Sequence, residues 1–347
     1  MKKNLVYLVA AMATASMAIT SCGNDSDQVV SAPKEAKTID LNAYLNNSPR
    51  AFTRADSALQ STELQDWTSI GVYVFENGKF AATTDFAGYE NYSIKSFEAL
   101  EDNSKFKLTP DSAMYYPFSG SAVDVYLYAP RMDAPVLDRD ASGIELKGDV
   151  KLDQSADSSY VASDLIFGKY VGASAAANKG VADVSLKHKL SKIIVKVTAS
   201  KGLTLSGVSK IELNGLAANY ALDFETGTVT SETGKSYRKN FIVASVNPGD
   251  TIALKEFNAI LDKGVAAIVP PQRTNNAEIV VTMNGKTCKA SLAEMGEKVN
   301  ENSETLESGK AYVINVLVKA DAIVVNAVAV TDWVDGGKYS VTMSEFE

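Results

Sequence analysis

The stretch TIDLNAYLNNSPRAFTRAD, Thr38–Asp56, holds the pattern that decides the fold. In its first half apolar and polar residues alternate with a period of two, which is typical of a half-buried β-strand. The second half is polar and carries two Arg-Ala pairs, Arg50-Ala51 and Arg54-Ala55. A strand that buries one face therefore stands beside a segment with the features of an exposed protease site. The apolar members of the strand are Ile39, Leu41, Ala43 and Leu45.

The same alternation recurs along the chain, whereas helical periodicity is scarce. The pairs Asn77-Gly78 and Asn284-Gly285 follow apolar runs and favour tight hairpins, because both positions tolerate positive φ. One short turn of helix is expected in Glu256–Leu261. Many short strands with frequent turns predict an all-β fold of β-sandwiches with few short helices. The clearest strand regions are Ser69–Phe80, Val123–Pro130, Tyr220–Ser231, Ala277–Leu292 and Ala311–Trp333.

The N-terminus has the features of an export signal. Lys2 and Lys3 precede the apolar run Leu5–Ile19, which is short for a membrane span. The run ends in small residues before Cys22, as in the lipobox of a bacterial lipoprotein, where the cysteine thiol receives a diacylglyceryl group. We expect Cys22 to be the lipidation site and residues 1–22 to be the signal peptide. The alternative is an ordinary secretory signal with an incidental cysteine.

The composition and the supply of reactive side chains restrict the function. The 347 residues are 46% hydrophobic and carry a net charge of −8, which argues against global disorder and against nucleic acid as a partner. His188 is the single histidine, and Cys288 is the one cysteine besides Cys22. One histidine and one available cysteine cannot build a zinc site of His/Cys type, and the sequence has no G-x-S-x-G nucleophile elbow. We therefore predict no enzyme, no cofactor and no metal site.

The surroundings of His188 and two acidic loops give further expectations. His188 lies between apolar neighbours on a strand, which predicts a packed, hydrogen-bonded residue, and the apolar phase slips near Ser191-Lys192, which predicts a bulge or bend. The acidic loops Asp138–Gly143 and Asp153–Asp157 do not have the spacing of a calcium loop, so calcium binding there stays open.

Several stretches, taken in order, resemble the fimbrillin-like proteins of Bacteroidetes, which are subunits of type V pili. The resemblance covers nearly the whole chain, and the order and spacing of the pieces carry it. The pieces are TSC ending at Cys22, SPRAF (Ser48–Phe52), SIGVYVFENG from Ser69, DLIFG (Asp164–Gly168), VSLKHKLSKIIVKV from Val184, IVPPQ (Ile268–Gln272), LESGKAYVINVLV (Leu306–Val318) and VTDW (Val330–Trp333).

The resemblance implies two tandem transthyretin-like β-sandwich domains and a processing route. The precursor would be an outer-membrane lipoprotein that an arginine-specific protease cuts between Arg50 and Ala51, with Arg54-Ala55 as second candidate. The removable first strand would then be Ile39, Leu41, Ala43 and Leu45. The expected segments are a propeptide at 23–50, an N-terminal sandwich at 51–200 and a C-terminal sandwich at 201–347, with the boundary in Val197–Gly207. The mature subunit would become part of a cell-surface fimbrium.

The C-terminal segment Lys338–Glu347 has the same alternating design as the removable strand. Its apolar members are Tyr339, Val341 and Met343, and Gly336-Gly337 precedes it. We expect it to be a donor strand that fills the groove of another subunit by β-augmentation. The other reading is that it is the last strand of the C-terminal sandwich.

Two functions follow from these patterns. The favoured one is a structural, adhesive pilus subunit whose partners are copies of itself, related subunits and host or bacterial surface ligands. The alternative is a surface lipoprotein that binds glycans or host proteins and does not polymerise. A monomeric binder has no need of a spare strand after its last domain, and this difference favours the pilus subunit. A cleavable N-terminal strand and a spare C-terminal strand are both present, which favours a stalk subunit over a tip or anchor subunit.

Overall fold

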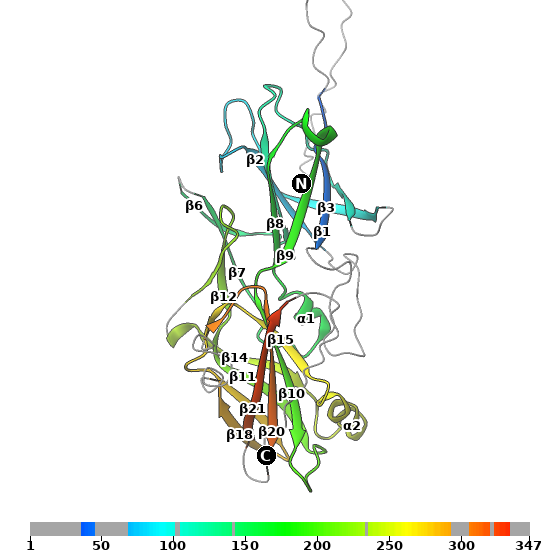
Figure 1. Cartoon of the computed structure of the whole chain (residues 1–347), viewed down its shortest axis with the longest axis vertical. Helices are drawn as coiled ribbons and strands as arrows, with labels where there is room; N and C mark the ends of the chain where they lie inside the picture. Colours follow the sequence, from blue (N-terminus) through cyan, green and yellow to red (C-terminus); the bar gives the residue numbers. More distant parts are fainter. Residues whose placement is uncertain are drawn as a thin grey trace, which may run out of the picture. The chain divides into compact units, whose positions relative to one another are not determined.

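The N-terminal strands pair edge to edge until they close into a barrel in the order β1-β4-β3-β2-β5-β8-β9 (Figure 1). The computed structural model describes residues 36–45, 69–100, 105–140, 143–232, 235–292, 305–319 and 323–333, all within the unit Ala36–Glu347. The barrel strands are β1 (Asp40–Leu45), β2 (Gly71–Glu76), β3 (Tyr89–Ala99), β4 (Phe106–Pro110), β5 (Val123–Ala129), β8 (Ile166–Ala173) and β9 (Val181–His188).

The remaining strands form three four-stranded sheets and one two-stranded sheet within the described residues. The first is β15 (Val265–Val269), β10 (Ser191–Ala199), β20 (Lys310–Val318) and β21 (Ile323–Asp332). The second is β14 (Arg238–Ser245), β11 (Val208–Ala217), β17 (Glu278–Met283) and β18 (Lys286–Ser291). The third is β13 (Val229–Ser231), β12 (Asn219–Asp223), β7 (Ile144–Asp149) and β6 (Val136–Arg139), and the small one is β16 (Gln272–Arg273) with β19 (Thr305–Leu306).

Helical structure is limited to short pieces in the described part of the chain. These are α1 (Asp157–Val161), α2 (Thr251–Ile260) and the 3-10 turns η2 (Ala177–Gly180) and η3 (Lys235–Tyr237). Helix α2 starts where it does because the Asp250 side chain accepts hydrogen bonds from the backbone N–H groups of Ile252 and Ala253. It contains most of the predicted turn Glu256–Leu261 and begins five residues earlier. The all-β class with few short helices is confirmed, with one addition, which is that β1 to β5 together with β8 and β9 close into a barrel.

Two apolar clusters share the wall made by β2 and β5. Val72 and Val74 of β2 point into the barrel, whereas Tyr73 and Phe75 point to a second, larger cluster outside it. β5 divides in the same way, with Val125 inside the barrel. The rings of Tyr73, Phe75, Tyr126, Tyr128, Phe167 and Phe224 contact one another in that outer cluster. The two strands are therefore buried on both faces, with aliphatic residues on one side and aromatic residues on the other.

The two Asn-Gly pairs behave differently. Asn284-Gly285 joins β17 and β18 as a two-residue hairpin, with φ of 51° and 75°, as predicted. Asn77-Gly78 also forms a turn, but the strand that pairs with β2 begins only at Tyr89. The tight hairpin predicted there is wrong. Asp124 explains the difference, because its carboxylate accepts hydrogen bonds from the Asn77 side chain and the Gly78 N–H and ties the turn to β5.

The phase slip near Ser191-Lys192 marks a change of sheet. β9 ends at His188 in the barrel, and β10 begins at Ser191 and pairs with β15 and β20. β6 and β7 also leave the barrel, although they lie between β5 and β8 in the sequence, and β7 pairs with β12. The division of the chain at residue 200 stays a prediction.

Candidate functional site

The first described strand, β1, completes the barrel by pairing on both of its edges. It runs antiparallel to β4, with Leu41 opposite Leu108, and parallel to β9, with Asp40 opposite Val181 and Leu45 opposite Leu186. Figure 1 shows β1, in blue, beside β9. A strand with two partners satisfies the backbone groups of both neighbours, so taking β1 away leaves two open sheet edges.

The inner face of β1 lies in the core of the barrel. Ile39, Leu41 and Ala43 retain 3%, 1% and 0% of their exposure, so these three side chains are core residues. This is the face that alternation in the sequence predicted. They pack in one cluster with side chains from all the remaining barrel strands, among them Ile70, Val72, Ile94, Leu108, Val125, Ile166 and Val184. Loss of β1 would open this cluster to water, because burying a Leu or Ile side chain is worth about 1.5–3 kcal/mol.

The segment before β1 adds further contacts to the barrel. The Ile39 N–H donates to the Met114 carbonyl at 2.8 Å, and the Tyr116 N–H donates to the Lys37 carbonyl at 2.9 Å. Thr38 forms an isolated bridge with Tyr115. The Tyr116 hydroxyl donates to the Gly180 carbonyl at 3.3 Å, and burial, aided by Tyr170 and Asp40, raises the pKa of Tyr116 to about 12. The seat of the strand therefore extends from Lys37 to Leu45.

The outer face of β1 carries a polar cluster. The Asn42 side-chain amide donates to Asp183 Oδ1 at 2.8 Å, and Lys105 Nζ lies 2.9 Å from Asp183 Oδ2. Lys105 Nζ also lies 5.5 Å from the centre of the Tyr44 ring. Burial alone would raise the pKa of Asp183, but the hydrogen bonds from Lys105 and Asn42 outweigh it and lower that pKa. Asp183 is therefore a carboxylate acceptor held by one residue of β1 and one residue beside β4.

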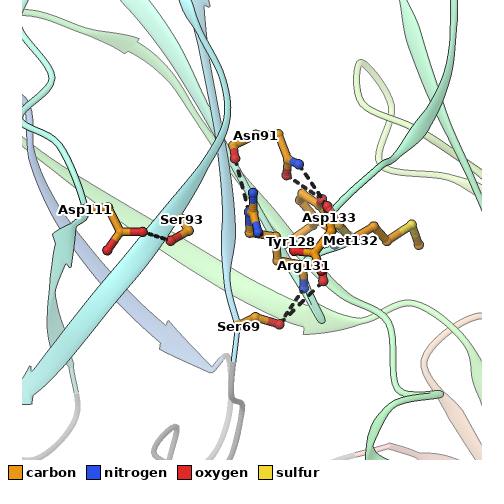
Figure 2. A network of polar contacts seen from close by, with 8 residues as sticks. All are labelled: Ser69, Asn91, Ser93, Asp111, Tyr128, Arg131, Met132 and Asp133. Atoms are coloured by element: carbon orange, nitrogen blue, oxygen red, sulfur yellow. Dashed lines mark hydrogen bonds and ion pairs between the residues drawn. The ribbon is translucent and has the colours of Figure 1, made fainter. Parts of the chain in front are cut away.

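A second polar network holds β3, the strand that pairs with β4 on the edge opposite β1 (Figure 2). Asn91 has a φ of 51° at a bulge opposite β2. Its amide donates to the Met132 carbonyl at 2.8 Å and accepts from the Tyr128 hydroxyl at 2.7 Å, while Arg131 Nε donates to the Asn91 carbonyl at 3.1 Å. Ser93 and Asp111 form a further contact between β3 and the end of β4 (Figure 2). These contacts keep one wall of the β1 groove in place.

The three motifs around Asp164, His188 and Trp333 meet in one buried cluster. His188 Nδ1 lies 2.9 Å from Asp164 Oδ1, and the His188 and Trp333 rings stack with centres 4.2 Å apart and planes 8° apart. The backbone N–H of Trp333 donates to the Gly309 carbonyl at 2.8 Å. The prediction of a packed, hydrogen-bonded His188 is confirmed. Trp333 ends the last described strand region, so the cluster holds the point from which residues 334–347 continue.

Only some of the predicted site residues lie within the part of the chain that the structure describes. Ile39, Leu41 and Ala43 come together in the groove, and Leu45 belongs to the backbone of β1. The lipidation, cleavage and donor positions lie outside the described residues: Cys22, Arg50, Ala51, Arg54, Ala55, Tyr339, Val341 and Met343. The sequence did not point to Asn42, Lys105, Asp183 or Asn91. The alternation places Asn42 on the polar face of the strand, but it does not identify Asp183 as the partner of Asn42.

The described residues hold no group of three or more His, Cys, Asp or Glu side chains placed to bind a metal ion. In the same part of the chain, none of the helices has both the length and the apolar character that a membrane crossing requires. The arrangement that stands out is thus a strand seated in a groove, with an apolar inner face and a polar outer contact.

Comparison with known proteins gives one family and a set of similar folds. The family model described as fimbrillin-like matches residues 53–333. A protein assigned to cell adhesion from Bacteroides uniformis has a TM-score of 0.58 at 16% identity, covering 87% of this chain and 99% of that one. Another protein assigned to cell adhesion, from Bacteroides ovatus, has a TM-score of 0.58 at 18% identity, covering 88% and 100%. No curated protein matches the sequence.

Proposed function

The chain belongs to the fimbrillin-like family, a family of non-enzymatic fimbrial subunits, and from this premise we propose that it is a structural subunit that polymerises by strand exchange. In this proposal β1 is a temporary occupant of its groove. Cleavage between Arg50 and Ala51 separates it from the rest of the chain, and a strand from another copy takes its place. The finished polymer is a cell-surface fimbrium that supports adhesion.

The observation that carries the proposal is the double seating of β1. A strand that contributes three core side chains and pairs with two neighbours cannot be lost without a replacement, because open sheet edges and an exposed apolar groove favour association. β1 also precedes the proposed cleavage site by only five residues, counting from Leu45 to Arg50. Cleavage there removes the covalent link between β1 and the barrel while leaving the groove intact.

The export route is part of the same proposal. We propose that Cys22 receives the lipid, that the lipid holds the precursor at the outer membrane, and that cleavage frees the subunit from that anchor. The donor is the segment Lys338–Glu347 of another copy, whose apolar residues Tyr339, Val341 and Met343 have the spacing of Ile39, Leu41 and Ala43. The partners are copies of this chain, related subunits and an arginine-specific protease.

The experiment that tests the proposal compares cleavage with polymerisation. The purified chain is treated with an arginine-specific protease, its new N-terminus is sequenced, and filaments are sought by electron microscopy. We expect Ala51 as the first residue and filaments only after cleavage. Arg50→Ala should stay a folded monomer, whereas Arg54→Ala, the matched control, should be cut and should polymerise. Filaments formed by Arg50→Ala without cleavage would overturn the proposal, and a folded, cleaved monomer would favour a non-polymerising binding protein.

A further inference from the structure

We propose that Lys105 and Asp183 form a clasp over the β1 groove that selects the occupying strand by its outer, polar residue. The clasp favours a strand that presents a hydrogen-bond donor opposite Asp183. This inference rests on the proposed exchange of β1 for a strand of a second copy, and it names the residues that give the exchange its specificity.

The clasp is defined by which strands its two residues belong to. β1 lies between β4 and β9. Lys105 immediately precedes β4, and Asp183 belongs to β9, yet Nζ and Oδ2 are 2.9 Å apart. Their contact therefore crosses the outer face of β1. The two side chains retain 35% and 38% of their exposure, so they lie at the surface, above a strand whose opposite face is in the core.

Asp183 also needs a hydrogen-bond donor from the strand that occupies the groove. An ionised carboxylate only accepts hydrogen bonds, and Asp183 accepts one from the Lys105 ammonium and one from the Asn42 amide. Asn42 stands directly opposite Asp183 in the parallel register. When β1 leaves, Oδ1 loses the Asn42 donor while Oδ2 keeps Lys105. An incoming acidic residue would repel Asp183, and an apolar residue would leave Oδ1 with a hydrogen bond unmade.

The sequence of the C-terminal segment supplies such hydrogen-bond donors. The residues that alternate with Tyr339, Val341 and Met343 are Ser340, Thr342 and Ser344, and each carries a hydroxyl donor. Whichever of the three takes the place of Asn42, a hydroxyl stands opposite Asp183 when the apolar residues point into the barrel. The occupant that fits the clasp is therefore the segment Lys338–Glu347 of a second copy of this chain.

The test measures the binding of two labelled peptides to the protease-cleaved full chain. One peptide is KYSVTMSEFE, and the other carries Ser340→Ala, Thr342→Val and Ser344→Ala, which remove the hydroxyls and keep the apolar residues. A hydrogen bond to a charged acceptor is worth about tenfold or more in affinity, so we expect the second peptide to bind about ten- to a hundredfold more weakly. The preference should change little with salt concentration, because both peptides carry the same charges and screening acts on charges.

A protein variant assigns that preference to the clasp. Asp183→Ala should reduce the difference between the peptides to less than about twofold. Glu90→Ala is the matched control, since it removes another ion pair of the barrel, with Arg139, away from the groove, and it should keep the full preference. Equal binding of both peptides by the unchanged chain, or loss of preference in Glu90→Ala, overturns the clasp. Because the peptide comparison leaves the protein unchanged, it decides even where Asp183→Ala does not fold. Binding of neither peptide by a cleaved chain that also forms no filaments refutes strand exchange itself.

Discussion

His188 shows how one side chain joins distant parts of the sequence. Its ring lies between the carboxylate of Asp164 and the ring of Trp333, and it is 7% exposed. Asp164 precedes β8, and Trp333 follows β21, so three separate elements meet at the end of β9. A buried carboxylate is tolerated where a partner donates to it, and His188 is that partner.

Replacing His188 should therefore destabilise the fold strongly. His188→Ala leaves the Asp164 carboxylate buried without this contact and removes the surface on which Trp333 stacks. We expect a loss of about 3 kcal/mol in the free energy of unfolding, measured by urea denaturation. Lys187→Ala, at the exposed neighbouring position, should change it by less than about 0.5 kcal/mol. Equal effects in the two variants would contradict the role of the cluster.

Tyr116 gives a pH dependence with a definite sign. The folded state holds the Tyr116 proton up to about pH 12, whereas an unfolded tyrosine releases it near pH 10. Between these values the unfolded state binds fewer protons, so stability falls as the pH rises, by up to about 1.4 kcal/mol per pH unit. Tyr116→Phe should flatten this part of the curve when unfolding is followed from pH 9 to 12. The difference at pH 7 serves as the control, because it isolates the hydrogen bond to Gly180. An unchanged alkaline slope would contradict the assignment.

At the scale of single residues, the sequence predicts burial well and partners poorly. The inward positions Ile39, Leu41 and Ala43 follow from alternation alone, and so does a packed His188. The contact between Asn42 and Asp183 does not, because 141 residues separate them and periodicity holds no information on which strands meet. The same limit hides the stacking of Trp333 on His188.

Among the elements, β8 and β9 approach each other unusually closely at Gly168. A Cβ atom added there would lie 2.2 Å from the Ser185 carbonyl oxygen, so any larger residue forces the two backbones apart. β9 is also the parallel partner of β1. The spacing of these two strands therefore sets the position of one wall of the groove.

Gly168→Ala should weaken both the fold and the seat of β1. We expect a loss of about 2–3 kcal/mol, with faster hydrogen exchange in β1 and β9 than in β17 and β18. Gly143→Ala is a suitable control, because its added Cβ meets no atom closer than 3.8 Å and it lies outside the barrel strands. A variant as stable as the control, with unchanged exchange in β1, would contradict the close approach.

Strand positions were largely readable from the sequence, whereas connections were not. The alternating runs that became β1, β2, β5, β17, β20 and β21 are all present in the structure. The hairpin expected at Asn77-Gly78 failed because Asp124, 46 residues further along the chain, captures the turn. A parallel pairing such as that of β1 with β9 has no local turn, so no short motif announces it.

For the whole molecule, the proposal makes the C-terminal segment dispensable for folding and necessary for growth. A chain that lacks Lys338–Glu347 should fold and be cut, because the proposal places this segment in the groove of another copy and not in its own domain. It should not extend filaments, and neither should Val341→Asp with Met343→Asp, since carboxylates are costly in an apolar groove. Gel filtration and electron microscopy of the cleaved chains measure this, with circular dichroism as the check on folding. Filaments of normal length from the shortened chain would rule out the donor, and an unfolded chain would make the segment the last strand of its own domain.

The parallel pairing of β1 with β9 also has a consequence in time. A chain synthesised from its N-terminus presents residue 42 long before residue 183, and at about 5–20 residues per second the delay is roughly ten seconds. Throughout this delay the edge of β1 that pairs with β9 is open, and an open strand edge is an aggregation hazard. Asp40, Asn42 and Tyr44, placed at every second position, keep one face of the waiting strand soluble. The pairing of β1 with β9 is therefore among the late contacts of the barrel, and under the proposed cleavage it is also a contact that is later given up.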